Sequence, residues 1–317
     1  MKMNSSMTMF VYMIFMSTLI SLSTNNWLSM WIMMEMALFM FIPLISKNKV
    51  NDQSMKYFII QSISSYTLIF SIMWNSSYET NLNSLLSLIS LMLKTGMAPF
   101  HLWKPMIMSK IKWKECMLLT TLIKIPPMIF FNKMIKFNMM ILPLSLSLIV
   151  GATSGINQLN LKKMMAYSSI FNLTWMTSSF LISKKIMLTF FTLYSLLNIK
   201  LMIFFKKNNL MYLNQMNYLP LNLKLIINMN MLSISGLPPL TGFYPKWIIL
   251  SEMINYSIIL PSMMVTTSIL SIYMYIQINS LCLSNSLVKK KNSKVISFKN
   301  FSLLNLLILP AMFMFWM

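Results

Sequence analysis

Five charged residues stand inside long apolar stretches, where water does not solvate them: Glu35, Lys94, Lys124, Lys200 and Lys246. A charged side chain at the centre of a bilayer costs about 2.5–3.5 kcal/mol or more, so such residues usually have a function. Lys200 lies near the end of its stretch, where a long lysine side chain reaches the interface. The other four are therefore the candidate functional residues.

The chemistry that these residue types favour is proton exchange. Taking a lysine out of water disfavours its charged ammonium form, and a nearby carboxylate favours that form again. Glu35 is the one acid placed centrally in an apolar stretch. A buried lysine whose carboxylate partner moves away is therefore a proton switch.

Prolines interrupt the same stretches close to the buried lysines. Proline has no N–H, so the carbonyl four residues before it loses its helical hydrogen-bond donor. At membrane depth such a carbonyl needs a water or side-chain partner. The alternative reading of each proline is a merely kinked helix. The freed carbonyls are those of Thr95 before Pro99, Leu122 and Ile123 before Pro126 and Pro127, and Ile234 and Ser235 before Pro238 and Pro239.

His101 is the single histidine and follows the first of these breaks. A histidine titrates near physiological pH and is a candidate proton relay; the alternative is a hydrogen-bonded residue at a helix end. Cys116 and Cys282 lie far apart and form no metal or redox motif. No phosphate-binding or dinucleotide-binding glycine motif is present. We therefore expect no cofactor and no metal in this chain.

The chain that holds these residues has the composition of an integral membrane protein. Of its 317 residues, 57% are hydrophobic and 10% charged, whereas a soluble domain has about 25% charged residues. The apolar stretches approach the roughly 18–20 residues that cross a bilayer as a helix, and they lack the alternation of barrel strands. We expect an all-α polytopic protein with about eleven spans, at approximately 7–24, 26–46, 55–74, 82–105, 115–132, 138–157, 162–182, 186–206, 223–253, 256–283 and 300–317, the fourth and ninth broken.

The basic residues predict an orientation. The chain has 26 basic residues, all of them lysine, against 5 acids. Such a balance in a soluble protein suggests nucleic acid, but here the lysines cluster between the spans, which favours lysine-rich loops on one side of a membrane. Most fall on the side of the N-terminus, and this assignment includes Lys104, Lys162 and Lys224. The N-terminus is therefore expected on the insertion side.

The two broken spans occupy corresponding places in two sets of five spans, which are inverted because five is an odd number. Broken helices in inverted repeats are typical of transport sites at the midplane. We expect one membrane domain over 1–317, with repeats at 1–135 and 136–285 and a C-terminal loop and helix at 286–317.

Four segments carry a family resemblance: NNWLSMWIMMEMALFMFIPLI, KTGMAPFHLW, NQLNLKKMMAYSSI and SGLPPLTGFYPKW. They resemble the chain 2 family of mitochondrial NADH–ubiquinone oxidoreductase, the antiporter-like subunits of respiratory complex I. An excess of methionine, with 38 residues, agrees with an animal mitochondrial code, and the composition suggests an insect. The resemblance implies inverted five-helix repeats, and a proton path that falls on Glu35, Lys94, Lys124 and Lys246.

Three positions depart from the family pattern. The family usually has a glutamate after the proline of its HFWxPE segment, where this chain has Met106. It often has a histidine after AYSSI where Asn172 stands, and an arginine where Lys162 stands. Because Met106 replaces the family's glutamate, we do not expect a peripheral role of that glutamate in this chain.

The expected function is proton translocation as a membrane-arm subunit of complex I. NADH:ubiquinone reductase would be the enzyme, and this chain would carry no redox chemistry. Flavin, iron–sulfur clusters and ubiquinone are expected in other subunits, and the expected partners are small core subunits, neighbouring antiporter-like subunits and lipids, without nucleic acid. The expected place is the mitochondrial inner membrane, with the N-terminus in the matrix. The alternatives are a stand-alone cation/proton antiporter and a non-pumping structural subunit.

Overall fold

The computed structural model describes residues 5–46, 51–77, 81–134, 137–238 and 240–284. Apart from an isolated bridge between Asn160 and Tyr212, the regular structure of these residues is helical. The chain divides into two compact units between Ser147 and Leu148. This boundary lies within α8 (Phe137–Ile156). The predicted C-terminal span at 300–317 lies outside the described residues.

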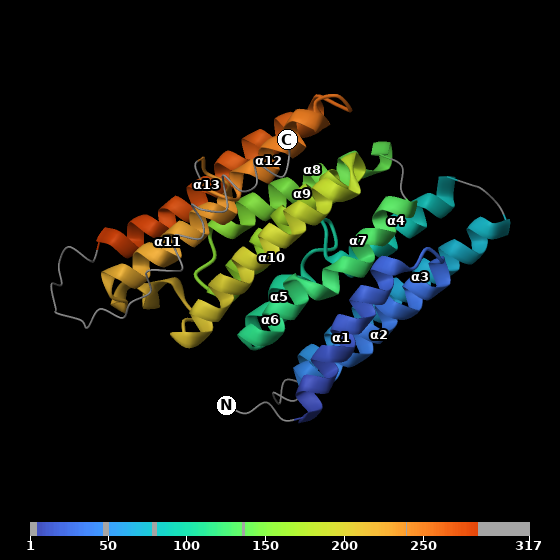
Figure 1. Ribbon diagram of the computed structural model, residues 1–317, viewed down its shortest axis with the longest axis horizontal. Coiled ribbons are helices and arrows are strands. Elements are labelled where there is room, and N and C mark those ends of the chain that lie inside the picture. The colour runs from blue at the N-terminus through green and yellow to red at the C-terminus, as the bar shows by residue number, and fades with distance from the viewer. Residues whose placement is uncertain (1–4, 47–50, 78–80, 135–136, 239, 285–317) are drawn as a thin grey trace. The chain divides into compact units, whose positions relative to one another are not determined.

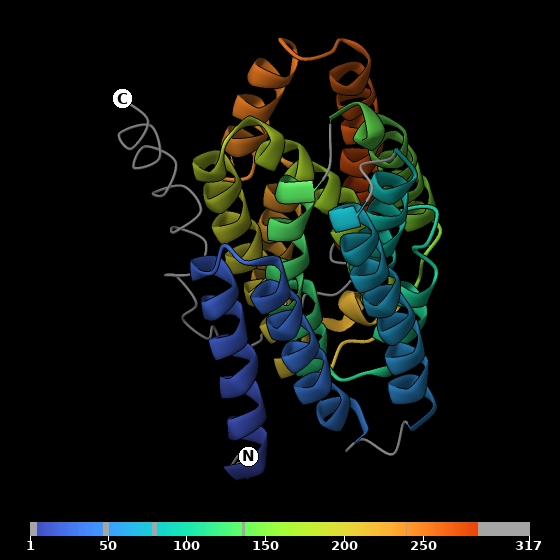
Figure 2. The ribbon, with the colours of Figure 1, turned by 90° about the vertical axis from the view of Figure 1, so that its right-hand side faces the viewer.

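The first unit is a bundle in which α1 and α2 run antiparallel and α3 packs on both α2 and α4 (Figures 1 and 2). Its α7 packs against α1, α2 and α4. These contacts place α2, α4 and α7 around a common interior. The helices before α8 are α1 (Ser5–Ser23), α2 (Trp27–Ser46), α3 (Asn51–Ser77), α4 (Asn81–Thr95), α5 (Trp103–Lys110), α6 (Trp113–Thr120), the short 3-10 helix η1 (Leu122–Lys124) and α7 (Ile125–Met134).

Helix α3 shows why the unit belongs in lipid. Its exposed face carries large apolar side chains at helical spacing, namely Met55, Ile59, Ile63, Tyr66, Phe70 and Met73. Its buried face is largely polar and includes Gln53, Ser54, Gln61, Ser64, Ser65 and Ser71. A soluble helix has the reverse arrangement, with apolar residues inward. Apolar residues outward and polar residues inward indicate a membrane helix that lines a polar interior.

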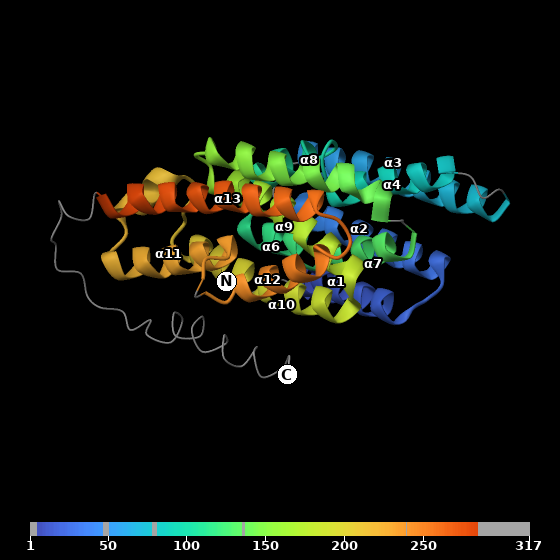
Figure 3. The ribbon, with the colours of Figure 1, turned by 90° about the horizontal axis from the view of Figure 1, so that it is seen from above.

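The second unit is built around α9, which is buried along nearly its whole length. Its interior hydroxyls do not stay unpaired, because Ser168, Ser169, Thr174 and Thr177 donate to carbonyls three or four residues earlier. Helices α10 and α12 pack against α9 and lie side by side in Figure 3. The helices after α8 are α9 (Leu161–Ile182), α10 (Lys184–Lys207), the 3-10 helix η2 (Leu213–Tyr218), α11 (Leu221–Ser235), α12 (Phe243–Met253) and α13 (Ile259–Ser284).

Local sequence explains several helix boundaries. Asn160 begins α9 because its side-chain oxygen accepts from the backbone N–H of Lys162. Ser183 begins α10 in the same way, accepting from Ile186. Such N-caps satisfy N–H groups that have no partner within the helix.

Six helices in the described part of the chain are long and apolar enough to cross a membrane by length and composition, and 84–95 is a shorter apolar helix. The predicted fourth and ninth spans are broken, into α4 with α5 and α11 with α12. The fifth, predicted as one helix, is broken too. Pro126 and Pro127 cannot donate to the carbonyls of Leu122 and Ile123, so Ile125 instead donates to Leu122 and the turn tightens into η1.

Candidate functional site

The centre of the first unit is an ion pair between α2 and α4. Lys94 Nζ donates to Glu35 Oε1 at 2.9 Å, and the two side chains are 4% and 13% exposed. The sequence predicted that each residue is buried and that a carboxylate supports the lysine. The structure supplies the contact, since the last turn of α4 brings Lys94 opposite the middle of α2.

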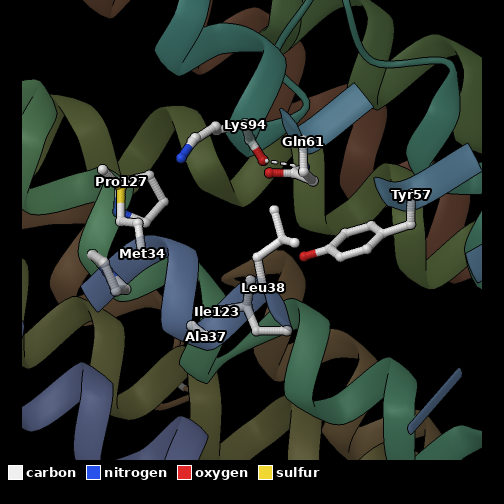
Figure 4. Close-up of a pocket in the computed structure, with 9 residues that line it drawn as sticks. Met34, Ala37, Leu38, Tyr57, Gln61, Lys94, Ile123 and Pro127 are labelled. Atoms are coloured by element: carbon white, nitrogen blue, oxygen red, sulfur yellow. Dashed lines mark hydrogen bonds between the residues drawn. The ribbon is translucent and has the colours of Figure 1, made fainter. Parts of the chain in front are cut away.

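A cavity lies beside this pair, and we call it the Gln61 cavity. The hydroxyl of Tyr57 and the side chain of Gln61 point into it from α3 (Figure 4). Gln61 Nε2 also donates to the carbonyl of Lys94 at 3.2 Å. The cavity has room for a water molecule and polar groups to bind one. Its lining consists of Met34, Ala37, Leu38, Tyr57, Gln61, Lys94, Ile123, Pro126 and Pro127.

A second cavity, which we call the three-lysine cavity, lies next to the first. Four residues line both cavities, namely Tyr57, Lys94, Ile123 and Pro127. The lining of the second cavity is Tyr57, Lys94, Thr95, Trp103, Lys104, Leu119, Ile123, Lys124 and Pro127. Three lysines from α4, α5 and η1 therefore border one small interior space. Water in these two cavities would connect the Glu35–Lys94 pair to Lys124.

The last carbonyls of α4, before its break from α5, all have hydrogen-bond donors. Gly96 has φ 72°, and its N–H and that of Met97 both donate to Met92. The next carbonyls are bound by side chains from elsewhere in the fold. Trp103 Nε1 donates to Leu93 at 3.1 Å, Gln61 to Lys94, and Lys104 Nζ to Thr95 at 3.1 Å. The carbonyl that Pro99 frees thus has a lysine as its donor.

Lys104 is a buried lysine whose position differs from the one that the sequence predicts. It was counted among the loop lysines near the N-terminal side of the membrane, yet it is 1% exposed. Lys162 and Lys224 were counted in the same way and are also buried. A signal for Lys104 was present, because a tryptophan and a proline flank it just as they flank Lys246, in WKP and PKW after the two breaks.

Lys124 ends η1 and is buried at the break in the fifth predicted span. Its side chain lines the three-lysine cavity together with that of Lys104. Two ammonium groups in so small an interior space repel each other, which favours a neutral form for one of the two amines.

The break between α11 and α12 in the second unit resembles the break between α4 and α5, and here the lysine that binds the freed carbonyls is Lys246. Gly236 has φ 84° and ends α11, as Gly96 ends α4. Lys246 Nζ, from the first turns of α12, donates to Ile234 at 3.2 Å and to Ser235 at 2.8 Å. These are the two carbonyls that the prolines free, so Lys246 provides the partner that the sequence argument required.

Aromatic rings also surround the Lys246 ammonium. Its Nζ lies 5.3 Å from the Phe171 ring centroid and 5.4 Å from that of Trp175, both on α9. Such cation–π contacts stabilise a desolvated cation. A cavity borders this lysine and is lined by Asn172, Phe190, Leu193, Tyr194, Leu197, Ser233, Ile234, Gly242, Pro245 and Lys246.

Asn172, one of the departures from the family pattern, therefore lines the cavity beside Lys246. Its side-chain nitrogen donates to the Ser168 carbonyl at 2.9 Å. Of the other two departures, Met106 is exposed on α5 and Lys162 is buried on α9. His101 lies in the first break with its Nδ1 3.2 Å from the Pro99 carbonyl, and it lines neither cavity of the first unit. Lys200 is partly exposed on α10.

The geometry supports proton chemistry. Glu35, Lys94, Lys104 and Lys124 form a buried titratable cluster in the first unit, and Lys246 is a separate site in the second. Within the described residues, no group of three or more His, Cys, Asp or Glu side chains is arranged to hold a metal ion. A buried carboxylate–lysine pair with an adjacent lysine can take up, pass and release protons.

Comparison with known proteins shows the family of the chain. The family model "NADH:quinone oxidoreductase/Mrp antiporter, TM" matches residues 24–271. NADH-ubiquinone oxidoreductase chain 2 of Locusta migratoria is 36% identical over 293 residues, covering 87% of this chain and 85% of the relative. That of Phoca vitulina is 35% identical over 282 residues, covering 83% and 81%.

A solved structure shows the same fold. A chain of respiratory complex I from Thermus thermophilus with bound aureothin has a TM-score of 0.78 at 18% identity, covering 98% of this chain and 81% of that one. The match to the family model includes the residues that line both cavities of the first unit, and it includes Lys246. The chain therefore belongs to the NADH:quinone oxidoreductase/Mrp antiporter membrane family, and within it to NADH-ubiquinone oxidoreductase chain 2.

Proposed function

We propose that this chain is an antiporter-like, proton-translocating subunit of respiratory complex I. The observation that carries the proposal is the buried Glu35–Lys94 ion pair, whose lysine borders the same cavity as Lys124. A carboxylate that can leave its lysine, with a second lysine close by, is the minimum needed to couple a change of charge to proton movement.

The coupling begins at the ion pair. Redox chemistry elsewhere in the complex separates Glu35 from Lys94, and the affinity of Lys94 for its proton falls because the carboxylate no longer favours the charged form. The proton passes to Lys124 through the three-lysine cavity. In the second unit Lys246 exchanges a proton in the same manner, with aromatic rings in place of a carboxylate around its charge.

We further propose about eleven spans in two inverted five-helix repeats, over 1–135 and 136–285, with a C-terminal helix. The two breaks support the repeats, because each has a left-handed glycine, Gly96 or Gly236, and a later lysine that donates back to the preceding helix end. The lysine distribution supports a matrix-side N-terminus, although Lys104, Lys162 and Lys224 no longer count toward it.

The chain works as part of NADH:ubiquinone reductase in the mitochondrial inner membrane. We assign the redox chemistry, with its flavin, iron–sulfur clusters and ubiquinone, to other subunits. The partners are neighbouring antiporter-like subunits, small core membrane subunits and lipids. The proton path comprises Glu35, Lys94, Lys124 and Lys246; His101 remains a candidate relay at the edge of the first break.

The proposal is tested in the assembled complex, reconstituted into liposomes, with Lys124→Met. The matched control is Lys114→Met, which removes an exposed lysine from α6. We expect Lys124→Met to lower the protons pumped per NADH oxidised, and the control to leave this ratio unchanged. Normal pumping by an assembled Lys124→Met complex would favour the structural subunit. Isolation of the chain as a homodimer that exchanges cations for protons would favour the stand-alone antiporter.

A further inference from the structure

Lys104 is a fully buried lysine that the proposed path does not use. Its amine makes one hydrogen bond to the Thr95 carbonyl at 3.1 Å, which leaves further N–H groups of the amine for other partners. The side chain borders the three-lysine cavity together with Lys94 and Lys124. The HFWxPE pattern of the family leaves this position variable, so nothing in the resemblance assigns it a role.

The closeness of Lys104 and Lys124 limits how many protons the two amines hold. Both side chains are buried and line the same small cavity, where two like charges disfavour each other. Two ammonium groups also cannot hydrogen-bond to each other, because neither has a lone pair to accept with, whereas one ammonium and one neutral amine can. A single positive charge on the pair is therefore favoured.

We propose that Lys104 is a proton-carrying residue between Lys94 and Lys124, and that Lys104 and Lys124 share a single mobile proton. This inference rests on the proposed function, because it adds a station to the same path. Lys104 would then bind and release the transferred proton, in addition to donating a hydrogen bond to the end of α4.

The transfer step is balanced within the pair. The Lys104 ammonium gives a proton to the Lys124 amine, so one N–H bond breaks at Lys104 and one forms at Lys124. Lys104 becomes a neutral amine and Lys124 an ammonium, and the total charge does not change. The neutral Lys104 amine still has N–H groups, so it keeps its hydrogen bond to Thr95 throughout. The helix break therefore need not rearrange when the proton moves.

A purely structural role for Lys104 predicts a different response to substitution. If Lys104 only caps the Thr95 carbonyl, any side chain with an N–H donor of similar reach should replace it. Arginine and glutamine both offer such donors, but arginine does not give up its proton and glutamine carries none. Lys104→Arg and Lys104→Gln thus preserve the cap and remove proton exchange, whereas Lys104→Met removes both.

The test uses the complete complex in liposomes, with electron transfer and proton pumping measured together and assembly checked by native electrophoresis. The control is Lys110→Met, which removes an exposed lysine from the same helix α5. We expect Lys104→Arg and Lys104→Gln to assemble and to lose about tenfold or more in pumping rate. Normal pumping by either assembled variant would overturn the proposal, because donation to Thr95 would then be sufficient.

Lys124→Met, measured beside these variants, separates the two proposals. If Lys124→Met stops pumping while Lys104→Arg or Lys104→Gln pumps normally, the shared-proton inference fails and the proposed function stands. If Lys124→Met and both Lys104 variants pump normally, the proposed function fails as well. Loss in all three, with the control unchanged, is the result that the inference predicts.

Discussion

Replacing Glu35 by glutamine keeps the size of the side chain but removes the negative charge that lies 2.9 Å from Lys94 Nζ. Glutamine can still accept a hydrogen bond, so the packing of α2 against α4 is largely preserved. The substitution therefore isolates the electrostatic part of the contact, on which the coupling of charge to proton movement depends.

The distance between Lys94 Nζ and Glu35 Oε1 sets how much electrostatic attraction the substitution removes. Two unit charges at this separation attract by about 6 kcal/mol at an effective dielectric constant of ~20, and removing one partner of a buried pair usually costs about 3–5 kcal/mol. At pH 7 an ordinary lysine gives up its proton for about 4–5 kcal/mol. The two costs are similar, so much of the Lys94 population in the variant should be neutral. A neutral Lys94 has no proton to release when the redox reaction proceeds.

The assay is the number of protons pumped per NADH oxidised, measured in liposomes that contain the assembled complex. We expect Glu35→Gln to lower this ratio, and Asp52→Asn, which changes an exposed acid in the first turn of α3, to leave it unchanged. A double variant, Glu35→Gln with Lys94→Gln, should lose no more than the greater of the single losses, because residues that act as a unit are not additive.

Two results would refute the reasoning. An assembled Glu35→Gln complex that pumps normally would show that the ion pair is structural. Losses that simply multiply in the double variant would show that Glu35 and Lys94 act independently, in spite of their contact.

Two further predictions concern the second unit. Lys246→Met leaves the two carbonyls that it binds without a donor, at about 1–3 kcal/mol each, so hydrogen exchange at the break should accelerate. Lys246→Arg should keep these carbonyls hydrogen-bonded, so hydrogen exchange at the break should stay slow, but it should still abolish pumping. Pumping by the arginine variant would contradict a proton-exchanging role of Lys246. Gly242→Ala should prevent assembly, because the new methyl group would overlap the Ser233 carbonyl oxygen. At Gly155 the only close approach of a new methyl group is to the flexible end of the Met274 side chain, so Gly155→Ala should assemble. Equal amounts of assembled complex from both glycine variants would contradict this.

Much of the fold followed from hydrophobic runs and their interruptions. The predicted span at 162–182 is α9, Leu161–Ile182. The stretch has no charge after Lys163, and Asn160 caps its start. The prolines indicated which carbonyls lose their donors. Pro126 and Pro127 indicated the freed carbonyls of the fifth span, but not the tight turn η1 before them. Proline at the start of a helix is usually tolerated, and the sequence does not say whether the turn before it continues.

The candidate site was only partly predictable. Glu35, Lys94, Lys124 and Lys246 were identified because a charge in an apolar run is conspicuous by itself. Lys104 was assigned to a loop, since it comes close before Lys110, Lys112 and Lys114 in the chain. Its burial depends on the turn at Gly96, which directs α5 back along the end of α4.

The sequence by itself determined that this is a helical membrane protein with buried charges beside broken helices. The free energy of transferring a segment from water to lipid depends on its own residues and their near neighbours, which the sequence gives directly. Tertiary structure alone decided the partners. Lys94 binds Glu35 on α2, a helix far away in the sequence. Lys104 and Lys246 instead bind carbonyls on the other side of the helix break that precedes each of them. Hydrogen bonds and ion pairs act over a few ångströms, and those separations are set by how helices pack rather than by the order of residues along the chain.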